Sequence, residues 1–193
     1  MTKPVRPQKF AHVVYRTRQF REMLDWYRAV FAATVEYQNP ALAILSYDDE
    51  HHRFALANLD TLRPNDAESD KRGLVGVDHV AYTYASLEDL FANYEELRKH
   101  GIEPYWCVHH GLTVSMYYAD PDGNQMEFQV DVFGTGDEAK AYQRSPIIEA
   151  NPVGVEYDPE KWLAGMRAGR PASEFLNRTV HEPVSPIRGA LAG

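Results

Sequence analysis

The chain contains an internal repeat, and this repeat constrains its fold more than any other feature. The segments Phe10-Ala-His-Val-Val-Tyr15 and Val77-Asp-His-Val-Ala-Tyr82 share a His-Val-x-Tyr core. Both segments are rich in Val and Tyr, as short buried strands are. Two copies of such a strand predict a chain that is built from two similar modules.

The same order of elements follows each copy of this strand. Apolar residues at helical spacing predict one helix at about 19–33 and another at about 86–100. Ser86 is a typical N-cap residue with Asp89 three positions later, and Gly101 stands where a helix commonly ends. Three short strands are predicted after each helix, at 34–37, 41–47 and 52–58 in the first half and at 103–108, 113–119 and 124–131 in the second.

Two tandem β-α-β-β-β modules predict an α+β fold. One module of this size has too little apolar surface to bury a full core, so we expect the two to pair into one mixed-sheet cup. In the tail, Asp158-Pro159 predicts the start of a short helix, and 177–193 is expected to be loosely ordered. We expect a single domain over 1–193, with module one at about 8–60, a polar linker at about 61–75, module two at about 76–131 and a C-terminal tail at about 132–193.

The composition excludes several classes of function. Twenty Lys and Arg against 28 Asp and Glu give a formal net charge of −8, which argues against a nucleic-acid partner and an anionic membrane surface. No apolar run reaches the ~20 residues of a membrane span, and no apolar segment of a secretory signal follows the basic N-terminus. Cys107 is the only cysteine, which suits a reducing cytoplasm. We therefore expect a cytoplasmic protein that acts on a small molecule.

Three side chains are candidate metal ligands. His12 and His79 occupy equivalent positions in the two modules, so pseudo-twofold packing would bring them to one cleft, where neutral imidazoles bind divalent ions well. The strand Gln125-Met-Glu-Phe-Gln-Val130 alternates polar and apolar residues, which places Glu127 on the face that would line the cup. The alternatives are hydrogen-bonded core histidines and a solvated Glu127. Together the three residues form a two-histidine, one-carboxylate set that is typical of non-haem Fe(II) oxygenases.

The last strand of the first module offers no fourth ligand. The segment Arg53-Phe-Ala-Leu-Ala-Asn-Leu59 contains neither a carboxylate nor Gln, which argues against a closed four-ligand Lewis-acid site. Histidine pairs at 51–52 and 109–110 precede this strand and the strand that carries Tyr117. A histidine can exchange a proton with a phenol near neutral pH, and a tyrosine hydroxyl can hydrogen-bond a phenolate oxygen.

Over about residues 8–131 the sequence resembles the vicinal oxygen chelate superfamily, in which paired modules cup a divalent metal. Within it, the chain is most similar to the small one-domain type I extradiol dioxygenases, which cleave catechol rings. The following Asp120-Pro-Asp-Gly123 turn is general to the superfamily, whereas the run His110-Gly-Leu-Thr-Val-Ser-Met-Tyr117 is much more specific. Asn151-Pro-Val-Gly-Val-Glu-Tyr-Asp-Pro159 in the tail also resembles these enzymes.

This resemblance implies a cofactor and substrates. In that family the first-strand histidines and the last-strand glutamate, here His12, His79 and Glu127, bind Fe(II), or Mn(II) in some members. The substrates would be O₂ and a small aromatic diol, and the range of such diols in the family includes bicyclic catechols. The family habit also implies a homo-oligomer.

The resemblance implies roles for three further residues. His52 would be the acid–base catalyst, with His51 as the alternative after a slip of one residue. His110 would hydrogen-bond the substrate or oxygen intermediates, and Tyr117 would contact the catecholate. His109 departs from the family pattern and has no assigned role.

Two alternative functions share the fold. A glyoxalase- or epimerase-like metal isomerase would require a fourth protein ligand in the last strand of the first module and would prefer Zn, Ni or Co. A non-catalytic antibiotic-binding protein would require no metal at all.

Overall fold

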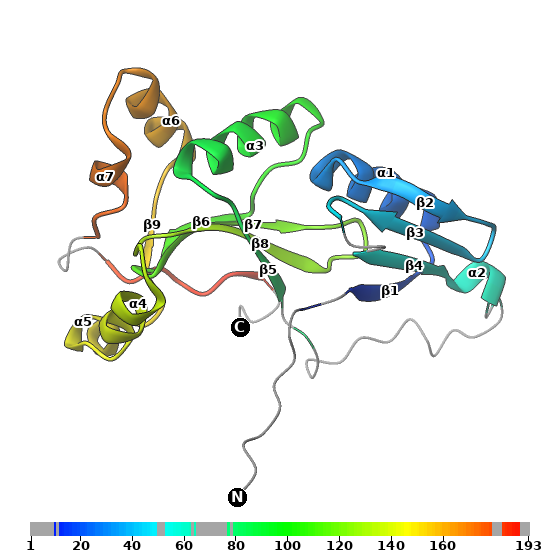
Figure 1. Cartoon of the computed structure of the whole chain (residues 1–193), viewed down its shortest axis with the longest axis horizontal. Helices are drawn as coiled ribbons and strands as arrows, with labels where there is room; N and C mark the ends of the chain where they lie inside the picture. Colours follow the sequence, from blue (N-terminus) through cyan, green and yellow to red (C-terminus); the bar gives the residue numbers. More distant parts are fainter. Residues whose placement is uncertain are drawn as a thin grey trace, which may run out of the picture. The chain divides into compact units, whose positions relative to one another are not determined.

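The chain divides into two compact units, and each holds one of the predicted modules. The computed structural model describes residues 10, 12–49, 53–62, 64, 77, 79–178 and 183–189. The units comprise residues 1–72 and 73–193, so their boundary falls within the stretch expected as a linker. In each unit one long helix, α1 (Phe20–Phe31) in the first and α3 (Leu87–Lys99) in the second, lies on one face of the sheet (Figure 1).

The first unit is a four-stranded sheet with a long helix on one face. Its strand order is β1-β4-β3-β2, in which β1 pairs in parallel with β4 and the other pairs are antiparallel. The elements are β1 (Val13–Thr17), α1 (Phe20–Phe31), β2 (Thr34–Gln38), β3 (Leu42–Ser46), β4 (Phe54–Asn58) and the short α2 (Leu59–Leu62).

Helix α1 packs on this sheet through its apolar stripe. Met23 and Tyr27 are fully buried, and the Tyr27 ring lies 4.7 Å from the ring of Phe54 on β4. Phe54 and Leu56 therefore face the helix, while Ala55 between them faces the other side of the sheet, because strand side chains alternate. Burying a large side chain of this kind contributes about 1.5–3 kcal/mol.

The second unit repeats this arrangement and adds a fifth strand. Its order is β5-β8-β7-β6-β9, so β5, β8, β7 and β6 correspond to β1, β4, β3 and β2. The predicted α+β fold with two β-α-β-β-β modules is confirmed. The module elements are β5 (His79–Thr83), α3 (Leu87–Lys99), β6 (Trp106–His109), β7 (Thr113–Ala119) and β8 (Gln125–Asp131).

The helix and turn signals of the second module act as predicted. The Ser86 hydroxyl accepts a hydrogen bond from the Asp89 N–H at 3.1 Å, which satisfies one of the exposed donors at the start of α3. Gly101, beyond the end of α3, has a φ of 71°, a conformation that costs glycine little. Between β7 and β8, Asp120 Oδ1 accepts from the N–H groups of Asp122 and Asn124, which closes the hairpin before Glu127.

The first strand of each module begins later than predicted, since Val77 and His12 both lie outside the strands. β1 begins at Val13, whose N–H donates to the Arg53 carbonyl beside β4, and β5 begins at His79. The ends of a strand depend on its hydrogen bonds to the neighbouring strand. The local Val and Tyr pattern does not show where that neighbouring strand begins. β6 likewise begins after Pro104, which has no N–H to contribute to a ladder.

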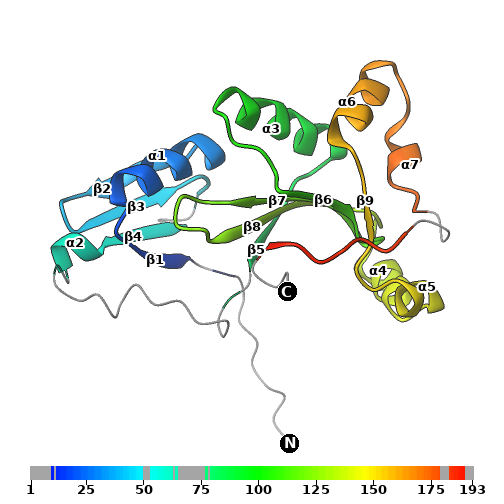
Figure 2. The same cartoon turned by 180° about the vertical axis from the view of Figure 1, so that it is seen from behind.

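The C-terminal tail contains more regular structure than the single helix predicted at Asp158. That helix is confirmed, because Asp158 Oδ1 accepts from the N–H groups of Glu160 and Lys161. Residues 183–189 cross the face of the sheet opposite α3 (Figure 2), with Ser185 only 5 % exposed. The tail elements are α4 (Gly136–Gln143), α5 (Pro146–Ala150), β9 (Val155–Glu156), α6 (Pro159–Arg167) and α7 (Ala172–Phe175).

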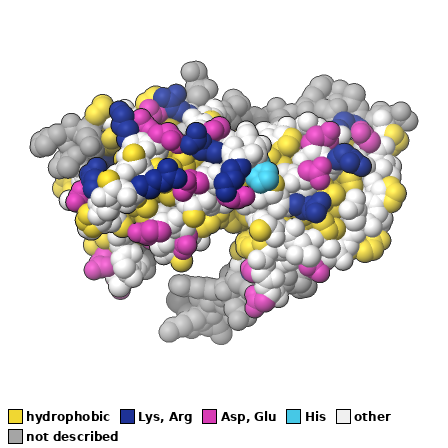
Figure 3. Space-filling view, turned by 90° about the horizontal axis from the view of Figure 1, so that it is seen from above, with side chains coloured by type: hydrophobic (Ala, Val, Ile, Leu, Met, Phe, Trp, Pro, Cys, Tyr) yellow, Lys and Arg dark blue, Asp and Glu magenta, His cyan; other side chains and the backbone are white. Residues whose placement is uncertain are grey.

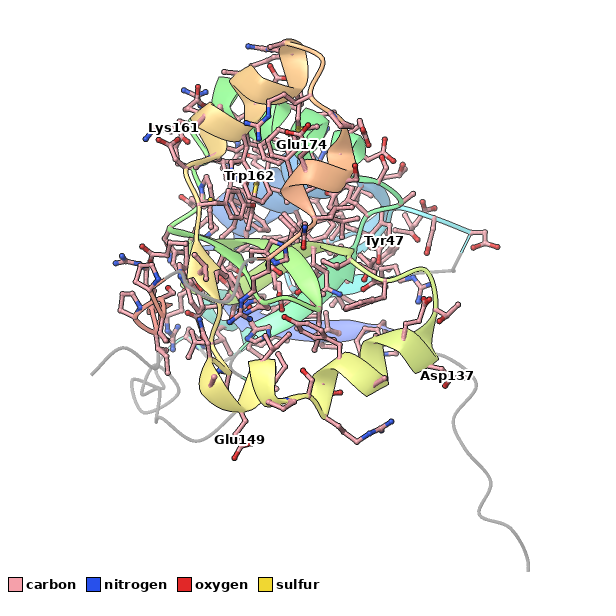
Figure 4. All side chains as sticks on the ribbon, turned by 90° about the vertical axis from the view of Figure 1, so that its left-hand side faces the viewer. Tyr47, Asp137, Glu149, Lys161, Trp162 and Glu174 are labelled. Carbon is pink, nitrogen blue, oxygen red and sulfur yellow. The ribbon has the colours of Figure 1, made fainter. Side chains whose placement is uncertain are left out.

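An aromatic contact holds the tail helices on the sheet. Trp162 points from α6 toward the interior of the unit, whereas Lys161 points outward (Figure 4). The Trp162 ring stacks on Tyr157 at 4.0 Å and lies 5.1 Å from Phe175 of α7. Large apolar rings at such distances dominate local packing energy, so α6 and α7 are integral parts of the second unit.

The helical faces carry both signs of charge. In Figure 3, Lys and Arg side chains are interspersed with Asp and Glu rather than gathered into a patch of one sign. On α3, Lys99 pairs with Glu96 at 2.6 Å, an exposed pair of the kind that contributes little to stability. None of the helices described here is long and apolar enough to cross a membrane.

Candidate active site

Strand register places the predicted site residues of the second unit on one face of its sheet. Trp106 of β6 lies opposite Tyr117 of β7, Tyr117 lies opposite Glu127 of β8, and Glu127 lies opposite Ala81 of β5. His79 is two residues before Ala81 and therefore points to the same side. The face is the one opposite α3, because the alternate residues Met116, Met126 and Phe128 form the buried apolar side.

Glu127 is the centre of this face. It is only 6 % exposed. Its Oε2 lies 3.1 Å from His79 Nε2, and its Oε1 lies 3.8 Å from His110 Nε2. The Tyr117 hydroxyl lies 3.0 Å from the same His110 nitrogen. The structure therefore brings together His79, His110, Tyr117 and Glu127, four of the predicted site residues.

The electrostatics of this cluster favour an ionised carboxylate beside a neutral imidazole. Burial acts to raise the pKa of Glu127, but hydrogen bonds from His79 and Ser115 outweigh it, so the pKa of this carboxyl is lowered. Burial lowers the pKa of His110, against the opposing effects of the Val153 carbonyl and the Glu127 carboxylate. A carboxylate and neutral imidazoles are the protonation states that a metal ligand and a proton acceptor require.

The donor spacing suits a small divalent ion. Two donors that bind at right angles, each about 2.1 Å from an ion, lie about 3 Å apart. His79 Nε2 and Glu127 Oε2 are 3.1 Å apart. One imidazole nitrogen and one carboxylate oxygen also form a donor pair that Fe(II) and Mn(II) accept. The residues of this unit therefore fit a divalent metal.

The remaining predicted residues belong to the first unit. His12 is exposed and immediately precedes β1, the position that corresponds to His79 in the repeat. Within the described residues no complete group of three His, Cys, Asp or Glu side chains is gathered for a metal. The predicted acid–base residue His52, and its alternative His51, lie outside the described residues.

The register also shows what stands opposite β1 in the first unit. Glu127 pairs with Ala81, and the corresponding pair in the first unit is Ala55 with Val14. The position equivalent to Glu127 is therefore a buried alanine, whose methyl group cannot bind a metal. This agrees with the absence of a carboxylate that the sequence shows in β4, and it disfavours the four-ligand site of an isomerase.

An aromatic wall adjoins the cluster, and sequence reasoning did not locate it. Trp106, Val108 and Tyr117 are buried together, with Tyr105 and Val153 packed against them. The Trp106 and Tyr117 rings are 4.9 Å apart and tilted by 30°. The Trp106 indole N–H donates to the Ser185 hydroxyl at 2.9 Å. The Tyr105-Trp106 pair at the start of β6 was the available sequence signal, but the side of the sheet on which Trp106 lies depended on the register of β6 with β7.

His109, which the sequence left without a role, faces away from this site. Its ring lies 6.3 Å from Trp162 of α6, and its Nδ1 accepts a hydrogen bond from the Gly111 N–H at 3.0 Å. Burial lowers its pKa from the ordinary 6.5 to about 4, against a smaller raising effect of the Leu176 carbonyl. His109 is therefore a neutral core histidine on the side of the sheet that α6 covers.

This environment predicts that stability falls in mild acid. Between pH 6.5 and pH 4 the unfolded chain binds a proton at His109 and the folded chain does not, so stability is full above pH 6.5 and decreases toward pH 4. We expect His109 to account for about 2 kcal/mol of lost unfolding free energy between pH 7.5 and pH 5. Urea unfolding of the wild type and His109→Asn at both values measures this, because the variant lacks the titration. An equal loss in both proteins would contradict the prediction.

Comparison with known proteins shows the family to which this chain belongs. Residues 9–128 match the family model described as the Glyoxalase/Bleomycin resistance protein/Dioxygenase superfamily. A structure described as a glyoxalase/bleomycin resistance protein/dioxygenase from Nocardioides aligns with a TM-score of 0.54 at 18 % identity, covering 69 % of this chain and 89 % of its own. At that identity the likeness shows the fold alone.

Two curated relatives from Rhodococcus globerulus narrow the match. The chain is 45 % identical over 167 residues to biphenyl-2,3-diol 1,2-dioxygenase 2, covering 86 % of both chains. It is 39 % identical over 171 residues to biphenyl-2,3-diol 1,2-dioxygenase 3, covering 88 % of both. These names describe cleavage beside the diol, which confirms the expectation of an extradiol ring-cleavage dioxygenase. The chain belongs to the Glyoxalase/Bleomycin resistance protein/Dioxygenase superfamily.

Proposed function

We propose that this enzyme opens a biaryl or other bicyclic catechol with O₂, at the bond beside the two hydroxyl-bearing carbons. Its divalent ion, Fe(II) or Mn(II), would be held by His12, His79 and Glu127. The observation that carries this assignment is the 3.1 Å approach of His79 Nε2 to the buried Glu127 carboxylate, with His110 beside it. His12 would complete the set from the equivalent position of the repeat.

The chemistry of this site divides between the ion and the side chains. When bound, the ion would supply a common binding point for the catechol oxygens and O₂ and a route for electron density between them. His12, His79 and Glu127 would hold it through three protein ligands, which is fewer than such an ion accepts. The Glu127 carboxylate would offset part of the positive charge of the ion, and its burial would keep competing water away from that side.

His110 and Tyr117 would handle protons and developing charge next to the diol. The Tyr117 hydroxyl lies within hydrogen-bonding distance of His110 Nε2 and is mounted opposite Glu127. A phenol in that position can donate to a catecholate oxygen, and the imidazole behind it can accept or return a proton. Both groups belong to strands or their ends rather than to a long loop, which favours precise positioning.

The aromatic wall supports a substrate with more than one ring. The Trp106 and Tyr117 rings pack together at 4.9 Å with Val108 in a buried apolar cluster, and Tyr117 lies opposite Glu127. Aromatic rings of a substrate pack favourably against such clusters. The relatives at 45 % and 39 % identity are named for biphenyl-2,3-diol, which has this shape.

Oxygen uptake by metal-loaded protein tests the proposal. The protein is loaded anaerobically with Fe(II) or Mn(II), assayed for bound metal, and then mixed with air and a panel of catechols that includes biphenyl-2,3-diol. We expect one O₂ consumed per ring opened, with a yellow product, and faster turnover on the biaryl diol than on catechol. No uptake with any diol by protein shown to hold iron would overturn the proposal.

Substitution of the proposed base should separate chemistry from metal binding. We expect His52→Ala to keep its iron and to lose about 10²–10⁴-fold in kcat, because a positioned proton acceptor contributes about that much. His51→Ala is the matched control and should retain turnover. Metal analysis and single-turnover rates measure both effects. Normal turnover of His52→Ala would show that the base is another residue.

A further inference from the structure

The backbone of the C-terminal tail touches the ring of His110. His110 Nδ1 lies 2.5 Å from the carbonyl oxygen of Val153. A carbonyl can only accept a hydrogen bond, so Nδ1 must carry the hydrogen. In a neutral ring the other nitrogen, Nε2, then has a lone pair, and it is this nitrogen that faces the Tyr117 hydroxyl at 3.0 Å.

The Val153 carbonyl is held in place by a turn that is closed on both sides. The Asn151 side chain accepts from the Gly154 N–H at 2.7 Å and donates to the Gly154 carbonyl at 3.0 Å. Gly154 has a φ of 122°, and a Cβ there would lie 2.6 Å from the His109 carbonyl oxygen. The turn therefore lies directly against the backbone of residues 109 and 110, an approach that only glycine permits.

One side chain joins this turn to the end of β6. The Arg178 guanidinium donates from Nη1 to the carbonyl of His110 at 2.8 Å and from Nη2 to the carbonyl of Asn151 at 3.1 Å. A planar guanidinium fixes the distance between two acceptors, which a flexible ammonium does not. Arg178 thus spans the histidine and the turn that binds its ring.

We propose that Arg178 is a positioning residue: by joining the 151–154 turn to His110, it fixes the Nδ1–H tautomer and presents the Nε2 lone pair to Tyr117 and the substrate. The effect of Arg178 on catalysis rests on the proposed function, whereas the Nδ1–H tautomer of His110 does not depend on that function. With Nε2 free of hydrogen, His110 enters the reaction as an acceptor. A proton that moves from a phenol oxygen to Nε2 yields an imidazolium whose Nδ1–H remains on the Val153 carbonyl.

The tautomer can be measured in metal-free protein without substrate. Long-range ¹⁵N–¹H NMR of ¹⁵N-histidine-labelled protein distinguishes Nδ1–H from Nε2–H. We expect Nδ1–H for His110 in the wild type and a substantial Nε2–H population in Arg178→Gln, because the tethered carbonyl is then released. Arg188→Gln is the matched control: Arg188 also belongs to the tail, but it pairs with Glu156 at 2.5 Å, so its variant should keep the wild-type signal.

Two results would overturn the proposal. The first is an Nε2–H signal for His110 in the wild type, which needs no variant to fold. The second is an unchanged Nδ1–H signal in folded Arg178→Gln. Either of these results can be obtained with an enzyme that cleaves catechols. The expected spectra can likewise be obtained with a protein that does not cleave them, so the NMR experiment tests the role of Arg178 separately from the proposed function.

Kinetics supply a second readout. In metal-loaded protein we expect Arg178→Gln to lower kcat about 10–100-fold with little change in KM, since His110 acts on the reacting groups rather than on substrate affinity. Arg188→Gln should leave both constants unchanged. A rise in KM alone would show that Arg178 shapes the substrate site and does not position His110.

Discussion

Glu127→Ala should abolish both metal binding and ring cleavage. The carboxylate is buried, lies 3.1 Å from His79 Nε2, and has a lowered pKa, so it is the anionic donor that adjoins the His79 imidazole. Groups that merely support a metal ligand contribute about 10–100-fold in affinity, and loss of a ligand costs more. We expect Fe(II) affinity to fall by more than about 100-fold, measured by equilibrium dialysis, and turnover to become undetectable.

Gln129→Ala is the matched control for this substitution. Gln129 is the next residue on the same face of β8, and its side chain donates to Thr83 Oγ1 at 3.1 Å rather than to the cluster. It should bind iron and turn over like the wild type. Full iron binding by folded Glu127→Ala would remove Glu127 from the metal site and would require a different anionic ligand.

Gly154→Ala should be the most destabilising small substitution in the tail. An added Cβ would lie 2.6 Å from the His109 carbonyl oxygen and 3.0 Å from the His110 Cα, and the φ of 122° is strained for alanine. Neither contact is with a flexible side chain, so the turn must move. We expect a loss of about 2–4 kcal/mol in unfolding free energy by urea denaturation, from backbone strain and overpacking together.

Substitutions at two other glycines distinguish backbone strain from steric overlap as causes of the expected destabilisation. Gly101 has a φ of 71°, but an added Cβ there would meet nothing within 4 Å, so Gly101→Ala should cost only the backbone strain, about 1 kcal/mol. Gly136 has neither constraint, and Gly136→Ala should be neutral within about 0.5 kcal/mol. A Gly154→Ala protein as stable as Gly136→Ala would mean that the tail does not lie against residues 109–110.

Local signals predicted most of the module structure. The repeated His-Val-x-Tyr strands, the Ser86 cap and the alternation around Glu127 each depend on residues a few positions apart, and such patterns act over that range. The predicted starts of the first strands were wrong because they depend on long-range contacts. β1 begins where the carbonyl of the distant Arg53 accepts a hydrogen bond from the Val13 N–H. Alternation predicted the face on which Glu127 lies, but its 3.1 Å approach to His79 needed the parallel register of β5 and β8.

The amino-acid order by itself determined two similar modules and an extradiol resemblance, and it predicted a metal-type donor set, because periodicity and short motifs record local geometry. Only the tertiary structure decided which way each ring faces: His109 points into the core and His110 into the site, although they are neighbours. It also decided that a turn more than 40 residues later binds His110 through a backbone carbonyl. No side-chain pattern encodes such a contact, because every residue has the same carbonyl and only the folded path selects one of them.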